Sequence, residues 1–309
     1  MFDTLLPVLP VLMLFMVGYV LQRISFFSPR SIGDMKKLVS NLALPALMFQ
    51  AFFAIEIESR YLILVALIFA SCLLMVLLGR FLSRPLGIRS PYFSIMMGGF
   101  EMGMLGYALF LALYGDQHLG KMALVDLGQV LFVFFVLMAL LIKEREGVSD
   151  PKTLVRQFLT SPVILAILAG LVASALKGEV RRGPFLESLG SFIDMLGSLT
   201  VPLIAITIGY GINIRKDGLV ASLKTILTRK ILALVIVLIL NAVVVDRMLG
   251  MDRMYRLAMM IMFLTPPPFV ISIFMKQDDR ANMDYVSNTL SLDTVISILL
   301  IIMMAAFYS

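Results

Sequence analysis

Apolar residues gather along the chain in ten long segments, each separated from the next by a short polar stretch. The segments lie at about residues 5–24, 39–54, 61–82, 92–114, 120–142, 160–176, 193–213, 226–245, 255–275 and 286–307. About 20 consecutive apolar residues suffice for a helix to cross the hydrocarbon core of a bilayer. The pattern predicts an all-α membrane protein with ten transmembrane helices, the second preceded by an interfacial helix that begins at Ser28 and Pro29.

The fourth segment is interrupted at its centre by Gly98, Gly99, Glu101, Gly103 and Gly106. Glycine weakens a helix, and irregular backbone at membrane depth is tolerated only where protein or a water-filled cavity satisfies its polar groups. An intramembrane carboxylate is costly unless it is paired or protonated. We therefore expect a broken helix with a functional site at Glu101. The alternative is a close helix-packing face in which Glu101 is hydrogen-bonded and purely structural.

The ninth segment is interrupted in a different way, by Thr265 followed by Pro266, Pro267 and Pro268. Each proline removes a backbone donor and clashes with the preceding turn, so three in a row cannot continue a helix. Interrupted segments at corresponding positions of two halves of a chain are the best sequence indication of a transporter site. The two breaks are therefore predicted to form one site.

A basic connector at residues 147–159 divides the chain into a first repeat at 1–146 and a second at 160–309. Each half holds five predicted transmembrane helices, and because five is odd, two related halves must lie inverted in the membrane. The halves share a short pattern in which a small polar residue precedes a proline by four positions. This pattern places Asn41 before Pro45 and Ser198 before Pro202.

Polar residues inside the fifth and tenth segments add further candidates, namely Asp126, Asn288 and Asp293. Acids within membrane helices usually face a bundle interior or a pathway. With Glu101, the two aspartates make three candidate groups for binding a proton or a cation. Asp126 lies near one end of its segment, so an ordinary boundary position is the alternative for that residue.

Composition and charge agree with a multi-pass membrane protein and set its expected orientation. Sixty per cent of the residues are hydrophobic and the mean hydropathy is +0.98. Basic residues number 18 in the loops after odd-numbered segments, with Arg229 and Lys230 counted there, and 8 on the other side. Since cytoplasmic loops carry the excess of Lys and Arg, both termini are expected outside the cytoplasm of a cell (inner) membrane. The excess of basic residues in the cytoplasmic loops accounts for the net charge of +6, so no nucleic-acid partner is needed to explain it.

Other functional classes find no support in the sequence. The lone cysteine, Cys72, excludes intramolecular disulfides, and there is no His/Cys cluster with metal spacing and no phosphate-binding Walker loop. No cofactor is expected other than a proton or a sodium ion for coupling. The expected partners are a small-molecule solute and the lipid bilayer, and a homodimer is allowed.

Several short motifs occur one after another along the whole chain. They are Leu6-Pro7-Val8-Leu9 with Gly18-Tyr19, the stretch from Asn41 through Pro45 to Leu47, Val201-Pro202-Leu203 through Gly209-Tyr210-Gly211, and the two interrupted segments. In this order the sequence resembles the auxin efflux carrier family of secondary transporters. The resemblance implies inverted five-helix repeats with crossing broken helices 4 and 9, as in bile acid/sodium symporters and sodium/proton antiporters. It also implies alternating access and an organic anion substrate.

The sequence departs from the family pattern at the first break. Family members commonly carry an asparagine there, followed by Gly-x-Pro, whereas this chain has Glu101 near that position and Gly106 followed by Tyr107 and Ala108. An acid in place of a neutral amide favours a proton or cation site, or a different substrate. The short chain without a long central loop is typical of a bacterial member.

The leading functional hypothesis is a secondary active transporter of a small organic solute, with a carboxylate favoured, coupled to protons or sodium. Opposed half-helix N-termini would attract the anion, and Glu101 and Asp293 would supply the coupling. A passive uniporter or channel is the alternative. An intramembrane aspartyl hydrolase using Asp126 and Asp293 is a remote third hypothesis, because the usual Gly-x-Gly-Asp context is missing, so the protein is not expected to be an enzyme.

Overall fold

The computed structural model describes residues 9–54, 58, 60–147, 151–176, 183–212, 218–275 and 279–308. Leu6, Pro7 and Val8 of the opening motif, residues 148–150 of the connector and the C-terminal Ser309 lie outside the described residues. The described part consists of helices joined by loops and contains no strand, which confirms the predicted all-α class.

The helices follow one another along the chain, joined by short loops or by π-helical turns. They are α2 (Leu9–Arg23), α3 (Pro29–Leu38), α4 (Leu44–Phe53), α5 (Arg60–Ser83), α6 (Tyr92–Met97), α7 (Tyr107–Tyr114), α8 (Leu119–Phe132), α9 (Met138–Glu146), α10 (Pro151–Thr160), α11 (Pro162–Ala175), α12 (Pro184–Ser198), α13 (Thr200–Gly211), α14 (Leu219–Leu240), α15 (Arg253–Leu264), α16 (Val270–Phe274) and α17 (Arg280–Phe307). The π-helical turns are η1 (Val39–Ala43), η2 (Met102–Gly106), η4 (Val133–Leu137) and η5 (Asn241–Met248), and η3 (Asp116–His118) is a 3-10 turn.

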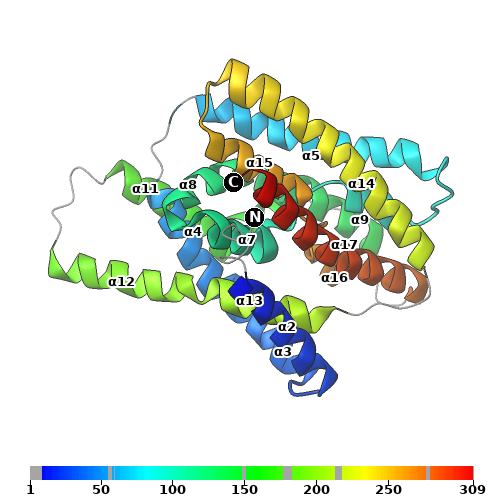
Figure 1. The fold of residues 1–309 in the computed structure, drawn as a ribbon, viewed down its shortest axis with the longest axis horizontal. Helices are drawn as coiled ribbons and strands as arrows, with labels where there is room; N and C mark the ends of the chain where they lie inside the picture. The colour runs from blue at the N-terminus through cyan, green and yellow to red at the C-terminus, as the bar shows by residue number, and fades with distance from the viewer. Residues whose placement is uncertain are drawn as a thin grey trace.

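Six helical runs in the described residues are long and apolar enough to cross a membrane, and two shorter apolar helices accompany them. The six are Tyr61–Ser83, Tyr92–Tyr114, Asp116–Arg145, Pro184–Gly211, Leu219–Met248 and Arg280–Phe307, and the shorter two are α2 and α11. The multi-pass membrane class is therefore confirmed, whereas the ten-helix inverted repeat stays a prediction. The helix expected at 193–213 begins nine residues earlier, at Pro184, and α12 projects beyond the rest of the bundle (Figure 1).

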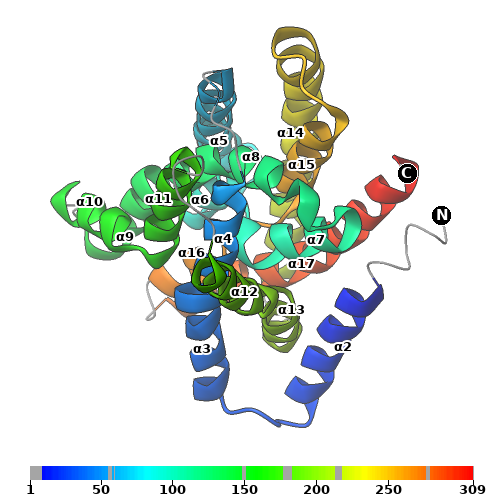
Figure 2. The ribbon, with the colours of Figure 1, turned by 90° about the vertical axis from the view of Figure 1, so that its left-hand side faces the viewer.

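The helices pack in two groups. In the panel group, α2 packs along α13, and α4 packs against α11 and α12. In the core group, α5 packs against α6 and α8, while α14 packs against α15 and α17. Figure 2 shows α2, α12 and α13 on one side of the molecule and α5, α14 and α15 on the other. Within the described residues the two groups meet where α13 packs against η2 and α7 of the first interrupted helix, and where α4 packs against α8.

Close backbone contact holds α2 against α13. A Cβ atom added to Gly18 would collide with the carbonyl group of Ile206, and one added to Gly209 would collide with that of Phe15. Small residues at helix interfaces in membranes permit this close approach and gain packing energy from it.

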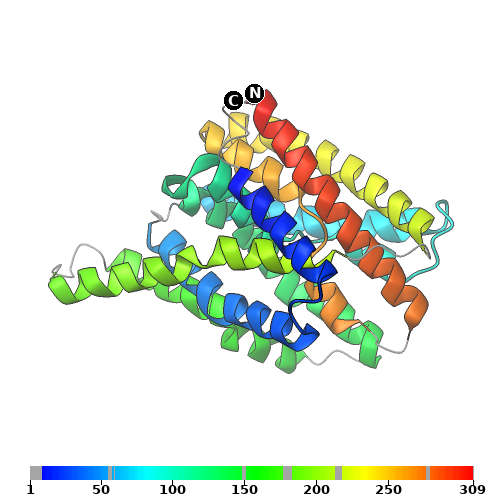
Figure 3. The ribbon, with the colours of Figure 1, turned by 60° about the horizontal axis from the view of Figure 1, so that its bottom comes forward.

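The first and last helices bring their free ends to the same side of the bundle. The N-terminal end of α2 and the C-terminal end of α17 both point to that side in Figures 2 and 3. An even number of membrane crossings has this consequence.

Candidate functional site

The fourth predicted helix is broken where its glycines indicated. Helix α6 ends at Met97, Gly98 is extended, and Gly99 has a φ of +74°, in the left-handed region that favours glycine. The chain resumes as helix at η2 and continues through α7. A Cβ atom on Gly99 would lie 3.0 Å from Pro268 Cγ. Both the backbone conformation and the close contact therefore favour glycine here.

The ninth predicted helix is broken where its prolines indicated. Helix α15 ends at Leu264, Thr265 is extended with φ −69° and ψ 159°, and helix resumes only at α16. The two breaks contact each other directly: the Glu101 N–H donates to the Pro266 carbonyl at 2.9 Å. The rings of Phe100 and Phe263 also contact each other, tilted by 47° with their centroids 4.6 Å apart. The two breaks therefore lie in contact, and their role as one transport site stays a prediction.

The Glu101 carboxylate connects the resumed halves of both broken helices. Its Oε1 accepts a hydrogen bond from the Met104 N–H at 3.0 Å, and its Oε2 accepts one from the Phe269 N–H at 2.6 Å. Side-chain oxygens that accept from the first N–H groups of a helix stabilise its start. The side chain is buried. Glu101 thus occupies the place at which the sequence hypothesis expected a substrate anion, and it is hydrogen-bonded as the structural alternative required.

Asp126 is linked to the same break from α8. It accepts hydrogen bonds from the Tyr107 hydroxyl at 3.1 Å and from the Gln129 amide at 3.0 Å, while Gln129 Oε1 accepts from the Phe100 N–H at 3.4 Å. The carboxylate is buried. The interpretation of Asp126 as a boundary residue is therefore wrong, because the helical run starts at Asp116 and places Asp126 well inside it.

A third group of charges lies where the first halves of the broken helices end. Asp293 of α17 is fully buried, and its Oδ1 lies 2.7 Å from the ammonium of Lys230 on α14. Asp293 Oδ2 lies 3.9 Å from Nε of the neighbouring Arg229, which is also fully buried. The two cations donate to backbone carbonyls of both breaks. Membrane-embedded charges are typically paired in this way.

Sequence reasoning missed these two cations. Arg229 and Lys230 were counted with the cytoplasmic loop residues, whereas the structure buries both on α14. Without them the number of basic residues in the predicted cytoplasmic loops falls from 18 to 16, against 8 on the opposite side. The expected orientation is therefore unchanged. Their adjacent positions inside the predicted 226–245 segment were the available signal, since cations at that depth need acceptors.

The remaining predicted residues lie either around the contact between the two breaks, here called the crossing, or in the panel group. Gly103 and Gly106 lie in η2, and the Thr265 carbonyl accepts from Lys230, while Asn288 is fully buried on α17. By contrast, Asn41, Pro45 and Pro202 lie in the panel group. The Asn41 amide donates to the Lys37 carbonyl at an exposed position, Pro45 is buried in the first turn of α4, and Pro202 is exposed on α13.

A cavity of about 120 Å³ lies beside Glu101, between the two helix groups. Met104 and Phe269, whose N–H groups bind Glu101, form part of its wall. Hydroxyl groups from both sides also line it, from Thr207, Ser272, Ser287, Ser291 and Thr294. Lys36 of α3 contributes a cation that interacts electrostatically with Glu101. The cavity therefore offers one cation and several hydroxyls to a small polar solute.

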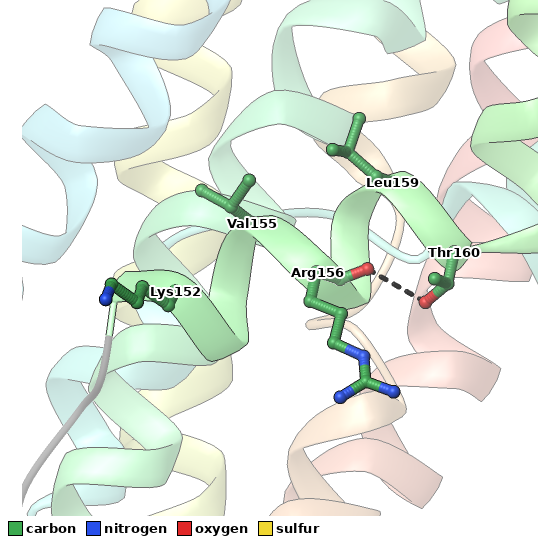
Figure 4. A pocket seen from close by; sticks show the side chains of 5 residues that line it. All are labelled: Lys152, Val155, Arg156, Leu159 and Thr160. Carbon is green, nitrogen blue, oxygen red and sulfur yellow. Dashed lines mark hydrogen bonds between the residues drawn. The ribbon is translucent and has the colours of Figure 1, made fainter.

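A larger hollow on α10 is a surface depression and not a site of this kind. It is formed by Lys152, Val155, Arg156, Leu159 and Thr160 of that single helix (Figure 4). The Thr160 hydroxyl donates to the Arg156 carbonyl at 2.8 Å, within the same helix. Apolar and basic residues on one short helix are typical of a segment that lies in the membrane interface.

An exposed ion pair outside the crossing joins the two core helices α8 and α15. Lys121 Nζ lies 2.5 Å from Asp252 Oδ2, and the Met254 N–H donates to Asp252 Oδ1 at 2.8 Å. Partial burial raises the pKa of Asp252, but these hydrogen bonds outweigh it and hold the pKa below its usual value. The start of α15, and with it the second break, is thereby attached to α8.

Two broken helices that meet at a buried carboxylate, beside a small polar cavity, are typical of membrane transport proteins. The family described as Membrane transport protein matches residues 3–305, so the chain belongs to this family, the auxin efflux carrier family. No curated relative matches the chain. The family is one of transporters and not of enzymes, which confirms that expectation and excludes the aspartyl hydrolase.

Proposed function

We propose that the protein is a secondary active transporter that carries a small organic anion by alternating access, coupled to protons or sodium. The observation that carries the proposal is the position of Glu101. One carboxylate holds the N–H groups of both resumed half-helices, and the residues that donate them, Met104 and Phe269, line a cavity between the two helix groups. Any movement of the core group relative to the panel group would change that cavity, and any change in the charge of Glu101 would change the contact between the breaks.

The size and lining of the cavity favour a carboxylate with few carbon atoms. At about 30 Å³ per water molecule, its volume of about 120 Å³ holds roughly four waters. The Lys36 ammonium would bind the carboxylate, since charge-assisted hydrogen bonds are the stronger ones. The hydroxyls of Ser272 and Ser291 would orient the rest of the solute.

Protonation of Glu101 gives a direct coupling step. The ionised carboxylate favours the observed contacts with Met104 and Phe269, and it repels a second anion in the same cavity. A proton on Glu101 removes that repulsion and weakens both hydrogen bonds, so the solute and the proton would bind together. Asp126, which is linked to the break through Gln129, would be the second site for a proton.

The proposed topology has ten membrane helices in two inverted repeats, at residues 1–146 and 160–309, in the inner membrane of a bacterial cell. Both termini would lie outside the cytoplasm. The ends of α2 and α17 on one side of the bundle support an even number of crossings (Figure 3). The broken helices at corresponding places of the two halves support the repeat.

Reconstitution into liposomes tests the proposal. Acetate, lactate, malonate and succinate are first screened for an increase in the unfolding temperature, because a ligand that binds only the folded state raises it. Uptake of the best binder is then measured with and without an imposed proton or sodium gradient. Accumulation above the outside concentration is expected only with a gradient. Uptake that merely equilibrates under every condition would make the protein a passive uniporter.

A further inference from the structure

The Lys230 ammonium is enclosed by four oxygen atoms. Its distances are 2.6 Å to the Leu264 carbonyl, 2.7 Å to Asp293 Oδ1, 2.8 Å to Ser297 Oγ and 3.3 Å to the Thr265 carbonyl. One carboxylate, one hydroxyl and two backbone carbonyls are the ligands that hard metal cations take in proteins. Unwound carbonyls and half-helix C-termini coordinate sodium in other transporters. The oxygens around Lys230 therefore have the composition of a cation site.

We propose that the ammonium group of the Lys230 side chain permanently occupies this cation site, so that no sodium ion binds there. The coupling part of this inference rests on the proposed transport function, in which it leaves the proton as the coupling ion. The binding part does not depend on transport, because it concerns only which cation the oxygens hold.

Arg229 supplies a cation to the backbone carbonyls of the first break in the same way. Its guanidinium donates to the carbonyls of Met96 at 2.8 Å, Met97 at 2.5 Å and Gly99 at 2.6 Å. Its Cζ also lies 4.9 Å from the centre of the Phe100 ring. The last carbonyls of a helix carry partial negative charge and attract cations. Adjacent residues of one helix thus supply one protein cation to each broken helix.

Asp293 has coordinating capacity that its present partners do not use. Within the described residues, its Oδ2 and the Arg229 Nε both lack a hydrogen-bond partner, although they are 3.9 Å apart. Two buried cations face this single carboxylate, and the carbonyls of the two breaks supply the remaining negative charge. Removal of the Lys230 ammonium would leave Arg229 as the one cation that balances Asp293, and the partial negative charge of the Leu264 and Thr265 carbonyls would have no cation beside it. The oxygens around the vacated position could then bind a metal ion.

The direct test is to shorten Lys230 and offer sodium in its place. Lys230→Ala removes the ammonium and keeps all four oxygens. Lys224→Ala is the matched control, because Lys224 lies on the same helix at an exposed position, where it donates to the Leu86 carbonyl. The double variant Lys230→Ala with Asp293→Asn keeps the space and removes the carboxylate. Lys230→Ser is the second variant in case the alanine variant does not fold.

Unfolding can be followed through Cys72, which is fully buried and is the single cysteine of the chain. A thiol-reactive dye reports its exposure, whereas tryptophan fluorescence is excluded because the chain has no tryptophan. Each protein is heated in sodium chloride and in choline chloride at equal ionic strength. For Lys230→Ala, sodium at about 100 times its Kd should raise Tm by roughly 5 °C or more. Wild type, Lys224→Ala and the double variant should show no sodium-specific shift.

Two results would overturn the inference. One is a Lys230→Ala or Lys230→Ser protein that folds and gives the same Tm in both salts. The other is a sodium-specific rise of Tm in the wild type. A Lys230→Ala protein that can be purified only in sodium would support it. Because the assay uses sodium as the probe and needs no substrate, a failure of the transport proposal would leave this result unchanged.

Discussion

Replacement of Gly99 by alanine tests the geometry of the first break through stability. Gly99 has a φ of +74°, and the left-handed conformation costs a residue with a Cβ atom about 1–2 kcal/mol. The new methyl group would also lie 3.0 Å from Pro268 Cγ, and overpacking of this kind costs about 1–3 kcal/mol. The expected loss is therefore about 2 kcal/mol or more. For a chain of this size, that is a decrease in Tm of at least roughly 4 °C.

Two other glycines separate the backbone contribution from the contact. Gly87 has a φ of +69° with nothing within 4 Å of an added Cβ, so Gly87→Ala should lose only the backbone part, about 1–2 kcal/mol. Gly33 lies inside α3 with equally open surroundings, so Gly33→Ala should stabilise by about 0.5–1 kcal/mol. Heating with the thiol dye at Cys72 should rank Tm in the order Gly33→Ala, wild type, Gly87→Ala, Gly99→Ala. A Gly99→Ala protein as stable as wild type would refute the described break.

Three further predictions concern the cavity, the second break and the topology. Lys36→Ala should raise KM for the carboxylate by about tenfold or more, because a hydrogen bond to a charged group contributes about 1.5–3 kcal/mol. Lys37→Ala, which removes an exposed ion pair with Asp34, should leave KM unchanged; equal effects of the two would contradict a role for Lys36. Alanine at all of residues 266–268 should allow a continuous helix and abolish transport in a protein that still inserts, so wild-type transport would show that the break is not needed. A reporter fused at Ser309 should be active outside the cytoplasm, and activity only inside would refute the proposed orientation.

The breaks were predictable because they depend on local chemistry. A glycine that needs a positive φ and three consecutive prolines disrupt a helix wherever it packs, and both interruptions lie where the sequence placed them. For Asp126 the sequence left two alternatives open, because the depth of this residue depends on where the helical run begins. The apolar segment was taken from 120, whereas the helical run extends from Asp116 to Arg145.

The partners of the buried charges could not be predicted, because they are distant in sequence. Arg229 contacts carbonyls about 130 positions earlier in the chain, and Lys230 contacts Asp293 and Ser297 more than 60 positions later. The shared pattern at Asn41 and Pro202 was equally uninformative about depth. Both residues lie at exposed positions in the panel group.

Proton-driven uptake by Glu101→Gln is the most direct measurement of the central claim. Glutamine keeps the shape of Glu101 and one acceptor for the N–H groups of Met104 and Phe269, but it cannot exchange a proton. In proteoliposomes, wild type should accumulate the carboxylate when the outside is made acidic. The Glu101→Gln protein should lose that accumulation and retain exchange of labelled for unlabelled solute at equal pH. Undiminished proton-driven accumulation by Glu101→Gln would contradict the account and assign the coupling to Asp126 or Asp293.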